Sequence, residues 1–262
     1  MLLAIDVGNT HTVLGLFERN TLRRHWRLQT DRGRTSDEYS ATLWNLTRMA
    51  GLDPTDVDAI IVCNVVPPMQ QIVEAMCRDT FGRSPLVVGP GTRSGMPILY
   101  DNPREVGADR IVNAVAAYER RHAATVVVDF GTATTFDVVS SRGEYLGGVI
   151  APGVGISLEA LFSRTAKLHP IELVPPPKVV GRNTVHAIQA GVFYGYVAMV
   201  DGVVDRIVEE QGETPFVIAT GGFASMIGAT SRVIEEVDEF LTLEGLRLIH
   251  ARNQEGGGHG RS

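Results

Sequence analysis

Two short segments carry residues whose types and order suit phosphate chemistry. Residues 6–12 read D-V-G-N-T-H-T, and residues 129–135 read D-F-G-T-A-T-T. In each segment an aspartate ends a short apolar run, and a turn of small polar residues follows. Such a turn presents backbone N–H groups and hydroxyls to one spot, and its glycine lets the backbone approach a ligand closely. Each segment is therefore a candidate phosphate loop, and the two together would grip a nucleotide triphosphate from both sides.

The two aspartates suit cations better than phosphate. Two anions in contact repel each other, so we expect Asp6 and Asp129 to hold cations. Of the 24 basic residues only Lys167 and Lys178 are lysines, and neither lies near the two segments in sequence. No G-K-[ST] occurs, which excludes a Walker A loop. The charge of a triphosphate must therefore be met by Mg²⁺, arginine, backbone amides and a second cation.

A third segment, residues 100–110, reads Y-D-N-P-R-E-V-G-A-D-R and leads into an expected helix. An aspartate at a helix start caps the first turn or answers the helix dipole. From the residues alone, that structural role explains Asp109 better than catalysis does. The Asp109–Arg110 pair by itself does not name a function.

Alternating strands and helices are expected to position these segments. Short apolar runs bounded by turn residues predict strands at 2–5, 12–17, 59–62, 86–88 and 125–129, and the turn after 129 leads into a further strand within 131–139. Helical spacing of apolar residues predicts helices at 36–50, 69–79 and 111–118. This alternation is typical of an α/β fold.

The two aspartate turns are offset by 123 residues, close to half the chain, and both lie between two strands. A match at half-chain spacing with the same flanking pattern indicates an internal duplication. We expect an N-terminal domain at 1–115 with the first phosphate loop. A C-terminal domain at 116–254 would hold the second loop and dimer contacts, and a disordered tail would follow at 255–262.

Composition excludes several other classes of protein. The 262 residues are 44% hydrophobic and 21% charged, as in a soluble globular protein. A net charge of −6 argues against nucleic acid and anionic membranes as partners. We find no apolar run near the eighteen or so residues that span a bilayer, and no signal peptide. Cys63 and Cys77 form no metal-like cluster, so we expect two reduced, buried thiols in a cytoplasmic protein.

At the three segments the sequence resembles a type III pantothenate kinase, within the superfamily of acetate and sugar kinases, actin and heat-shock ATPases. Further matches are G-G-V-I-A-P-G (147–153), Asn183-Thr184 with A-I-Q-A-G (187–191), and T-G-G (220–222). Val106 stands where the family usually has leucine, a conservative change. The resemblance implies an α/β, actin-like (ribonuclease H-like) ATPase fold, with two similar domains of mixed sheet plus helices around a nucleotide cleft.

The resemblance also implies an activity and a set of site residues. The activity is ATP-dependent phosphorylation of pantothenate to 4'-phosphopantothenate, the first step of coenzyme A biosynthesis. Asp109 would be the general base that takes the proton from the primary hydroxyl of pantothenate. The residues implied for ATP are Asp6, Val7, Gly8, Asn9, Thr10, His11, Thr12, Val13 and Thr132. Those implied for pantothenate are Tyr100, Gly107, Ala108, Asp109, Arg110 and Thr184.

For cofactors and partners, the resemblance implies K⁺ or NH₄⁺ at Asp129, Mg²⁺ with ATP (through water at Asp6), and a cytoplasmic homodimer without nucleic acid or membrane partners. Two alternatives remain. The first is a kinase of the same fold that acts on another small hydroxy acid or sugar. The second is a non-catalytic nucleotide-binding regulator. The presence of Asp6, Asp109 and Asp129 favours the enzyme, because a pure binder has no need of a base.

Overall fold

The computed structural model describes residues 1–165 and 167–255, which divide into two compact units. Unit 1 comprises Met1–Met96, Asp101–Ala116 and the chain from Thr242 on, and unit 2 comprises Pro97–Tyr100 and Ala117–Leu241. Relative to the expected domains, the chain from Thr242 is grouped with the first unit and four residues near 100 with the second. Glu255 ends the helix α7 (Leu241–Glu255), and the rest of the expected tail, 256–262, lies outside the described residues.

Unit 1 contains a five-stranded sheet in the order β3-β2-β1-β4-β5. Its strands are β1 (Leu2–Val7), β2 (His11–Glu18), β3 (Thr21–Gln29), β4 (Ala59–Asn64) and β5 (Leu86–Val87). β1 pairs antiparallel with β2 and parallel with β4. Four of these strands were predicted. The fifth, β3, was not, because its exposed arginines make it a polar edge strand with little apolar signal.

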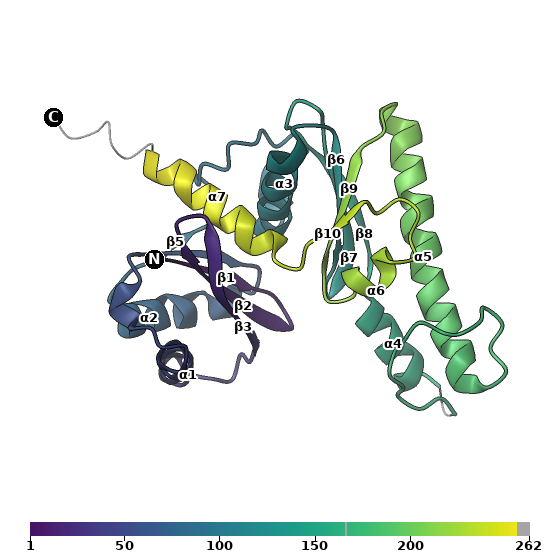
Figure 1. Ribbon diagram of the computed structural model, residues 1–262, viewed down its shortest axis with the longest axis horizontal. Helices are drawn as coiled ribbons and strands as arrows, with labels where there is room; N and C mark the ends of the chain where they lie inside the picture. The colour runs from purple at the N-terminus through teal and green to yellow at the C-terminus, as the bar shows by residue number, and fades with distance from the viewer. Residues whose placement is uncertain (166, 256–262) are drawn as a thin grey trace. The chain divides into compact units, whose positions relative to one another are not determined.

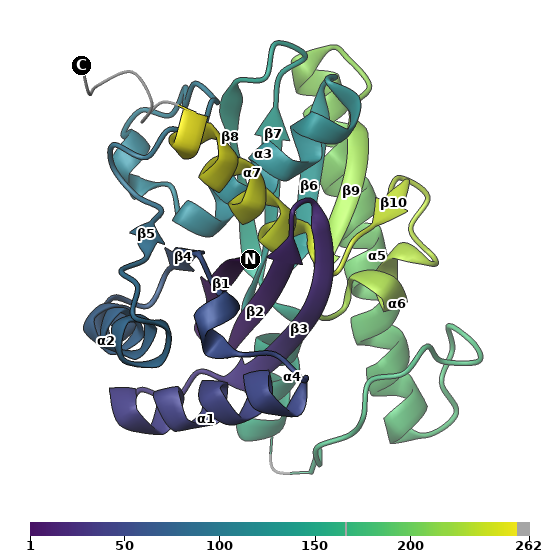
Figure 2. The same cartoon turned by 60° about the vertical axis from the view of Figure 1, so that its left-hand side comes forward.

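The two faces of this sheet are covered by different helices. On one face lie α1 (Ser36–Met49) and α2 (Gln70–Phe81) (Figure 2). Leu3, Ile5 and other side chains of the sheet pack against these two helices. Thr35 caps α1 through a capping box with Glu38. On the other face, α7 lies so close to β2 that a Cβ on Gly15 would be 2.7 Å from Leu243 Cδ1. Both predicted helices of this unit are confirmed.

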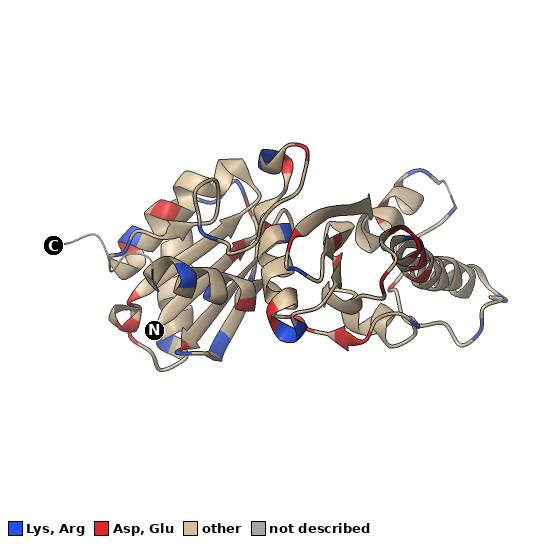
Figure 3. Ribbon diagram, turned by 90° about the horizontal axis from the view of Figure 1, so that it is seen from above, with Lys and Arg blue, Asp and Glu red and all other residues tan. Residues whose placement is uncertain are grey.

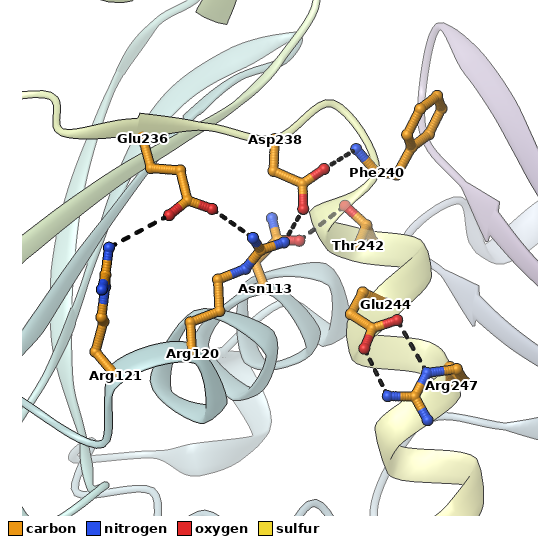
Figure 4. Close-up of polar contacts among 9 residues, drawn as sticks. All are labelled: Asn113, Arg120, Arg121, Glu236, Asp238, Phe240, Thr242, Glu244 and Arg247. Carbon is orange, nitrogen blue, oxygen red and sulfur yellow. Dashed lines mark hydrogen bonds and ion pairs between the residues drawn. The ribbon is translucent and has the colours of Figure 1, made fainter. Parts of the chain in front are cut away.

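Helix α3 (Ala108–Arg121) belongs to unit 1 up to Ala116 and to unit 2 from Ala117. In unit 1, the Thr242 hydroxyl of α7 donates to Asn113 Oδ1 over 2.7 Å (Figure 4). In unit 2, Arg120 forms ion pairs with Glu236 and Asp238. Each half of α3 is thus bonded to the last part of the chain within its own unit.

Unit 2 repeats the architecture of unit 1. Its strands are β6 (Thr125–Phe130), β7 (Ala133–Val139), β8 (Tyr145–Pro152), β9 (Phe216–Gly221) and β10 (Glu236–Val237), in the order β10-β9-β6-β7-β8. β6 pairs antiparallel with β7 and parallel with β9. Counted from the first strand of each half, both sheets read third, second, first, fourth, fifth. The duplicated α/β fold predicted from the two aspartate turns is confirmed.

Three helices cover one face of the second sheet: α4 (Val154–Ser163), α5 (Thr184–Gln211) and α6 (Ala224–Gly228) (Figure 1). By length and composition alone α5 is long and apolar enough to cross a membrane, a test that the core helix of a globular domain also passes. Phe193, Val200 and Val204 of α5 are buried in the core of unit 2, as in the core helix of a globular domain. Short 3₁₀ helices span Pro54–Asp56, Pro67–Met69 and Pro103–Glu105.

The charged residues and cysteines agree with the expected composition class. Acidic and basic residues are interspersed along the ribbons (Figure 3). Cys63 and Cys77 are free and buried, as predicted. Burial raises the pKa of the Cys77 thiol to about 12 and that of Cys63 well above its ordinary value. Neither thiol is therefore ionised near neutral pH.

Candidate functional site

The first candidate phosphate loop is the tight turn between β1 and β2. The Gly8 N–H donates to the His11 carbonyl over 3.0 Å and closes the turn, which leaves Asn9 and Thr10 exposed. Asp6, half-buried, is paired in register with Val13 of β2 and Cys63 of β4. Strand pairing thus fixes the Asp6 carboxylate at the end of the sheet where the exposed turn begins.

This turn is supported by Thr30, which follows β3 and which the sequence did not suggest. Its N–H donates to the Thr10 carbonyl over 3.0 Å, and its hydroxyl donates to the Gly8 carbonyl over 2.7 Å. The same hydroxyl lies 2.9 Å from Thr12 Oγ1, a buried group. The turn therefore has a fixed backbone conformation set from the neighbouring strand.

The second candidate loop, Gly131-Thr132, occupies the equivalent place in unit 2. Asp129 pairs in register with Thr135 of β7 and Thr220 of β9, as Asp6 does with β2 and β4. Gly153 at the start of α4 lies against the carbonyls of Gly131 and Thr132 with no room for a Cβ.

The surroundings of Asp129 suit a cation with oxygen ligands. Gly221 has φ +91, and a Cβ there would lie 2.6 Å from Asp129 Oδ1 and 2.6 Å from the Phe130 carbonyl oxygen. Carboxylate and carbonyl oxygens are the ligands that hard cations take. Among the described residues no group of three or more His, Cys, Asp or Glu is placed to hold a metal. A cation at Asp129 would therefore depend on carbonyl and water oxygens as well.

Asp109 lies in the first turn of α3, one position after its first residue. The Gly107 carbonyl accepts from the N–H groups of Arg110 and Ile111, so Gly107 rather than Asp109 is in the capping position. The Asp109 carboxylate also accepts the Arg110 N–H over 2.8 Å, so this donor at the start of the helix is shared between the Gly107 carbonyl and the Asp109 side chain. The side chain therefore has a structural role whatever its chemical one.

The electrostatic environment of Asp109 favours a proton acceptor. Burial raises the pKa of this carboxyl above its usual value, and the hydrogen bond and charge of Arg110 oppose that shift. A carboxylate with a raised pKa is a stronger base than an ordinary one. A Cβ on Gly107 would lie 2.5 Å from Asp109 Oδ1, so a larger residue there would displace the Asp109 carboxylate.

Asp6 and Asp109 converge within unit 1. Cys63 of β4 is fully buried beside Asp6, and the negative charges of both aspartates contribute to the raised pKa of its thiol. The structure thus brings the first phosphate turn and the start of α3 to the same end of the first sheet.

Tyr100 belongs to unit 2, where backbone hydrogen bonds hold the segment 97–100. The Tyr145 N–H donates to the Pro97 carbonyl, and the Leu99 N–H donates to the Tyr145 carbonyl, both over 2.8 Å. The half-buried ring of Tyr100 lies against Gly147, and its centroid is 6.4 Å from that of the Tyr145 ring.

Tyr145 is in turn fixed by a buried aspartate that the sequence reading missed. Its hydroxyl donates to Asp137 Oδ1 over 2.8 Å, and both residues have no exposed surface. An aspartate inside the apolar run F-D-V-V was the signal available in the sequence. These two residues form the support beneath Tyr100.

Thr184 is the exposed first residue of α5, and its side chain makes no hydrogen bond within the described residues. Asn183 caps this helix, since its Oδ1 accepts the His186 N–H over 2.8 Å. The predicted site residues thus divide between the units. Unit 1 holds the segments 6–13 and 107–110, and unit 2 holds Tyr100, Asp129, Thr132 and Thr184.

Comparison with known proteins gives concordant results. The sequence profile of the type III pantothenate kinase family matches residues 2–206. The type III pantothenate kinase of Pelobacter propionicus is 59% identical over 254 residues, which are 97% of this chain and 100% of that protein. The Myxococcus xanthus enzyme of the same name is 59% identical over 253 residues, 97% of this chain and 99% of the other.

Among solved structures, the activator of 2-hydroxyisocaproyl-CoA dehydratase from Clostridium difficile, with bound ADPNP, has a TM-score of 0.57 at 11% identity. It covers 100% of this chain and 99% of its own. A protein described as a Baf family transcriptional activator from Campylobacter jejuni has a TM-score of 0.59 at 18% identity, covering 97% and 99%. At these identities the likeness concerns the fold alone.

Proposed function

Because the chain belongs to the type III pantothenate kinase family, we propose that it transfers the γ-phosphoryl group of ATP to the primary hydroxyl of pantothenate. The products are ADP and 4'-phosphopantothenate, the first intermediate on the way to coenzyme A. The observation that carries this proposal is the 59% sequence identity to a type III pantothenate kinase over 97% of the chain. The two aspartate turns in equivalent places of the two sheets support a nucleotide as the phosphoryl donor.

Asp109 is the general base in this proposal. Its carboxylate takes the proton of the primary hydroxyl while the hydroxyl oxygen forms a bond to the γ-phosphorus and the bond to the β-γ bridging oxygen breaks. The raised pKa of Asp109 and the hydrogen bond that holds its Oδ1 support this role. Phosphoryl transfer depends mainly on alignment and charge stabilisation. A fixed carboxylate orients the attacking hydroxyl and stabilises the positive charge that develops on it.

The ATP phosphates bind in this proposal at the turn from Asp6 to Val13, with Thr132 contacting the nucleotide from the second turn. The exposure of Asn9 and Thr10 supports this assignment. Mg²⁺ bound with ATP would be held through water at Asp6 and would supply positive charge for the phosphates. K⁺ or NH₄⁺ at Asp129 is supported by the oxygen-lined surroundings of that carboxylate.

Pantothenate is proposed to contact Tyr100, residues 107–110 and Thr184, in a cytoplasmic homodimer. Apolar side chains are exposed on the edge strand β8, among them Ile150 at 64% exposure. They support an interface on unit 2 that a second subunit would cover. Gly191 and Gly195 of α5 have open space where a Cβ would stand, which permits close approach of a second helix.

The experiment that tests this function is ADP release from the purified protein with MgATP, with and without pantothenate, in potassium and in sodium buffer. Turnover that requires pantothenate and potassium is the expected result. Turnover indifferent to potassium would keep the kinase and remove the monovalent cation from Asp129. Turnover with another hydroxy acid or sugar alone would change the substrate, and ATP binding without any turnover would indicate a regulator.

A further inference from the structure

The loop after β3 places an arginine on the first phosphate turn. Arg32 Nη2 donates to Asn9 Oδ1 over 3.0 Å. The loop that carries Arg32 is itself anchored. The Asp31 N–H donates to the buried Tyr39 hydroxyl over 2.9 Å, and the Gly33 N–H donates to Asp31 Oδ1 over 2.8 Å. The guanidinium is therefore directed to the turn from a loop bonded on both sides of it.

Arg32 differs from neighbouring arginines in what it contacts. Arg34 lies over the Tyr39 ring at 5.1 Å and donates to Thr42, and Arg23 is paired with Glu18. The side chain of Arg32 is exposed, and within the described residues it forms no ion pair with a carboxylate. A neutral amide oxygen leaves the charge of a guanidinium uncompensated and occupies one of its five N–H donors.

The first phosphate turn has no lysine or arginine of its own to bind phosphate. Residues 6–13 contain no lysine or arginine, and the two lysines of the chain, at 167 and 178, lie in unit 2. A polyphosphate bound at residues 8–10 needs a compensating positive charge besides Mg²⁺. Arginine is well suited to that task because its planar group donates two parallel hydrogen bonds to phosphate oxygens.

We propose that Arg32 binds the phosphate groups of ATP at the Gly8–Thr10 turn, with Asn9 orienting its guanidinium. This inference rests on the proposed function in one respect, namely that the turn binds ATP. Arg32 then supplies from the β3–α1 loop the fixed cation that this turn lacks in its own sequence. Because loop and turn are hydrogen-bonded before ATP arrives, little ordering cost remains at binding.

Three variants separate charge from geometry. Arg32→Gln keeps an N–H donor for Asn9 and removes the charge, whereas Arg32→Lys keeps the charge. Arg24→Gln is the matched control, because Arg24 is an exposed arginine of β3 whose side chain makes no hydrogen bond or ion pair within the described residues. Calorimetry of MgATP and of adenosine with each full-length variant, without pantothenate, gives the dissociation constants.

The expected result is specific to phosphate. A hydrogen bond to a charged group contributes about 1.5–3 kcal/mol, so Arg32→Gln should weaken ATP binding by about 10-fold or more. Adenosine binding should not change, Arg32→Lys should lose less than Arg32→Gln, and Arg24→Gln should match the unaltered protein.

Three results would overturn the proposal. These are ATP binding by Arg32→Gln equal to that of the unaltered protein, equal losses for ATP and adenosine, or equal losses in Arg32→Gln and Arg24→Gln. Failure of the kinase proposal looks different, because the unaltered protein would then bind ATP without turning over pantothenate while the comparison of variants still stands. An unaltered protein that binds no ATP would refute both.

Discussion

Replacing Asp109 with asparagine separates the two roles of this side chain. The amide oxygen still accepts the Arg110 N–H that Asp109 Oδ1 accepts over 2.8 Å, so the first turn of α3 keeps its bond. The amide cannot take a proton from the substrate hydroxyl. We therefore expect Asp109→Asn to fold normally and to lose most of its turnover.

The size of the loss follows from the role. A positioned base contributes typically about 10²–10⁴-fold, so kcat should fall by that factor. At about 1.36 kcal/mol for each factor of ten, the barrier rises by roughly 2.7–5.4 kcal/mol. Because the base must be ionised, kcat/KM of the unaltered enzyme should fall as pH drops through the raised pKa of Asp109. That acid limb should lie above about pH 3.9, where an ordinary aspartate titrates.

As pH rises through the raised pKa of Asp109, the contribution of this residue to the free energy of unfolding should fall while kcat/KM rises. A raised pKa means that the folded protein disfavours the ionised carboxylate. The contribution of Asp109 to stability is therefore fully present below the ordinary pKa and is lost as pH rises through the raised one. At neutral pH the uncharged amide removes this penalty, so the free energy of unfolding of Asp109→Asn should not be lower than that of the unaltered protein.

The assay is steady-state ADP release combined with urea unfolding of the same preparations. Asp101→Asn is the control, because Asp101 is exposed in the same segment. A variant that unfolds at lower urea yet turns over normally per folded molecule would refute the reasoning and leave Asp109 as a structural residue.

Three further predictions concern the residues that hold the site in place. Gly107→Ala should lower kcat with little change in melting temperature, because its Cβ displaces Asp109 Oδ1, and an unchanged kcat would contradict this. Tyr145→Phe should lower the free energy of unfolding in urea by about 1.5–3 kcal/mol, since it removes a hydrogen bond to the buried Asp137 carboxylate; equal stability would show that this bond is not needed. Asn183→Ala should cost about 1 kcal/mol in the same measurement with kcat retained, and a variant as stable as the unaltered protein would exclude the cap.

The parts of the fold that were predictable have strong local signals. The two strand–turn–strand units follow from apolar runs that end in aspartate, and their repetition predicts two similar sheets. The helix α5 has apolar residues on all sides and glycines at 191, 195 and 202, so it shows no single apolar face. The position of α7 on the first sheet depends on contacts over more than a hundred residues, such as that between Gly15 and Leu243. No local pattern encodes such a contact.

The candidate site divides in the same way. Residues on the turns and at the start of α3 were identified because their order is itself a motif. Thr30 and Arg32 were missed because strand pairing, not sequence proximity, brings them to Gly8 and Asn9. Asp137 was visible as a charge within an apolar strand, but its partner Tyr145 follows from the register of β7 and β8.

The division of the chain between the units has a consequence for synthesis on the ribosome. The strands of unit 1 are made before most of unit 2, yet the helix that covers their second face, α7, is made after it. Val112 packs against Gly245 of that helix so closely that no Cβ fits between them. Most of unit 2 is one continuous stretch, 117–241, and is complete before α7 appears. All residues of unit 2 are therefore available for folding before unit 1 is complete. Until α7 is made, one apolar face of the first sheet is exposed, and exposed apolar surface of this kind is what chaperones bind.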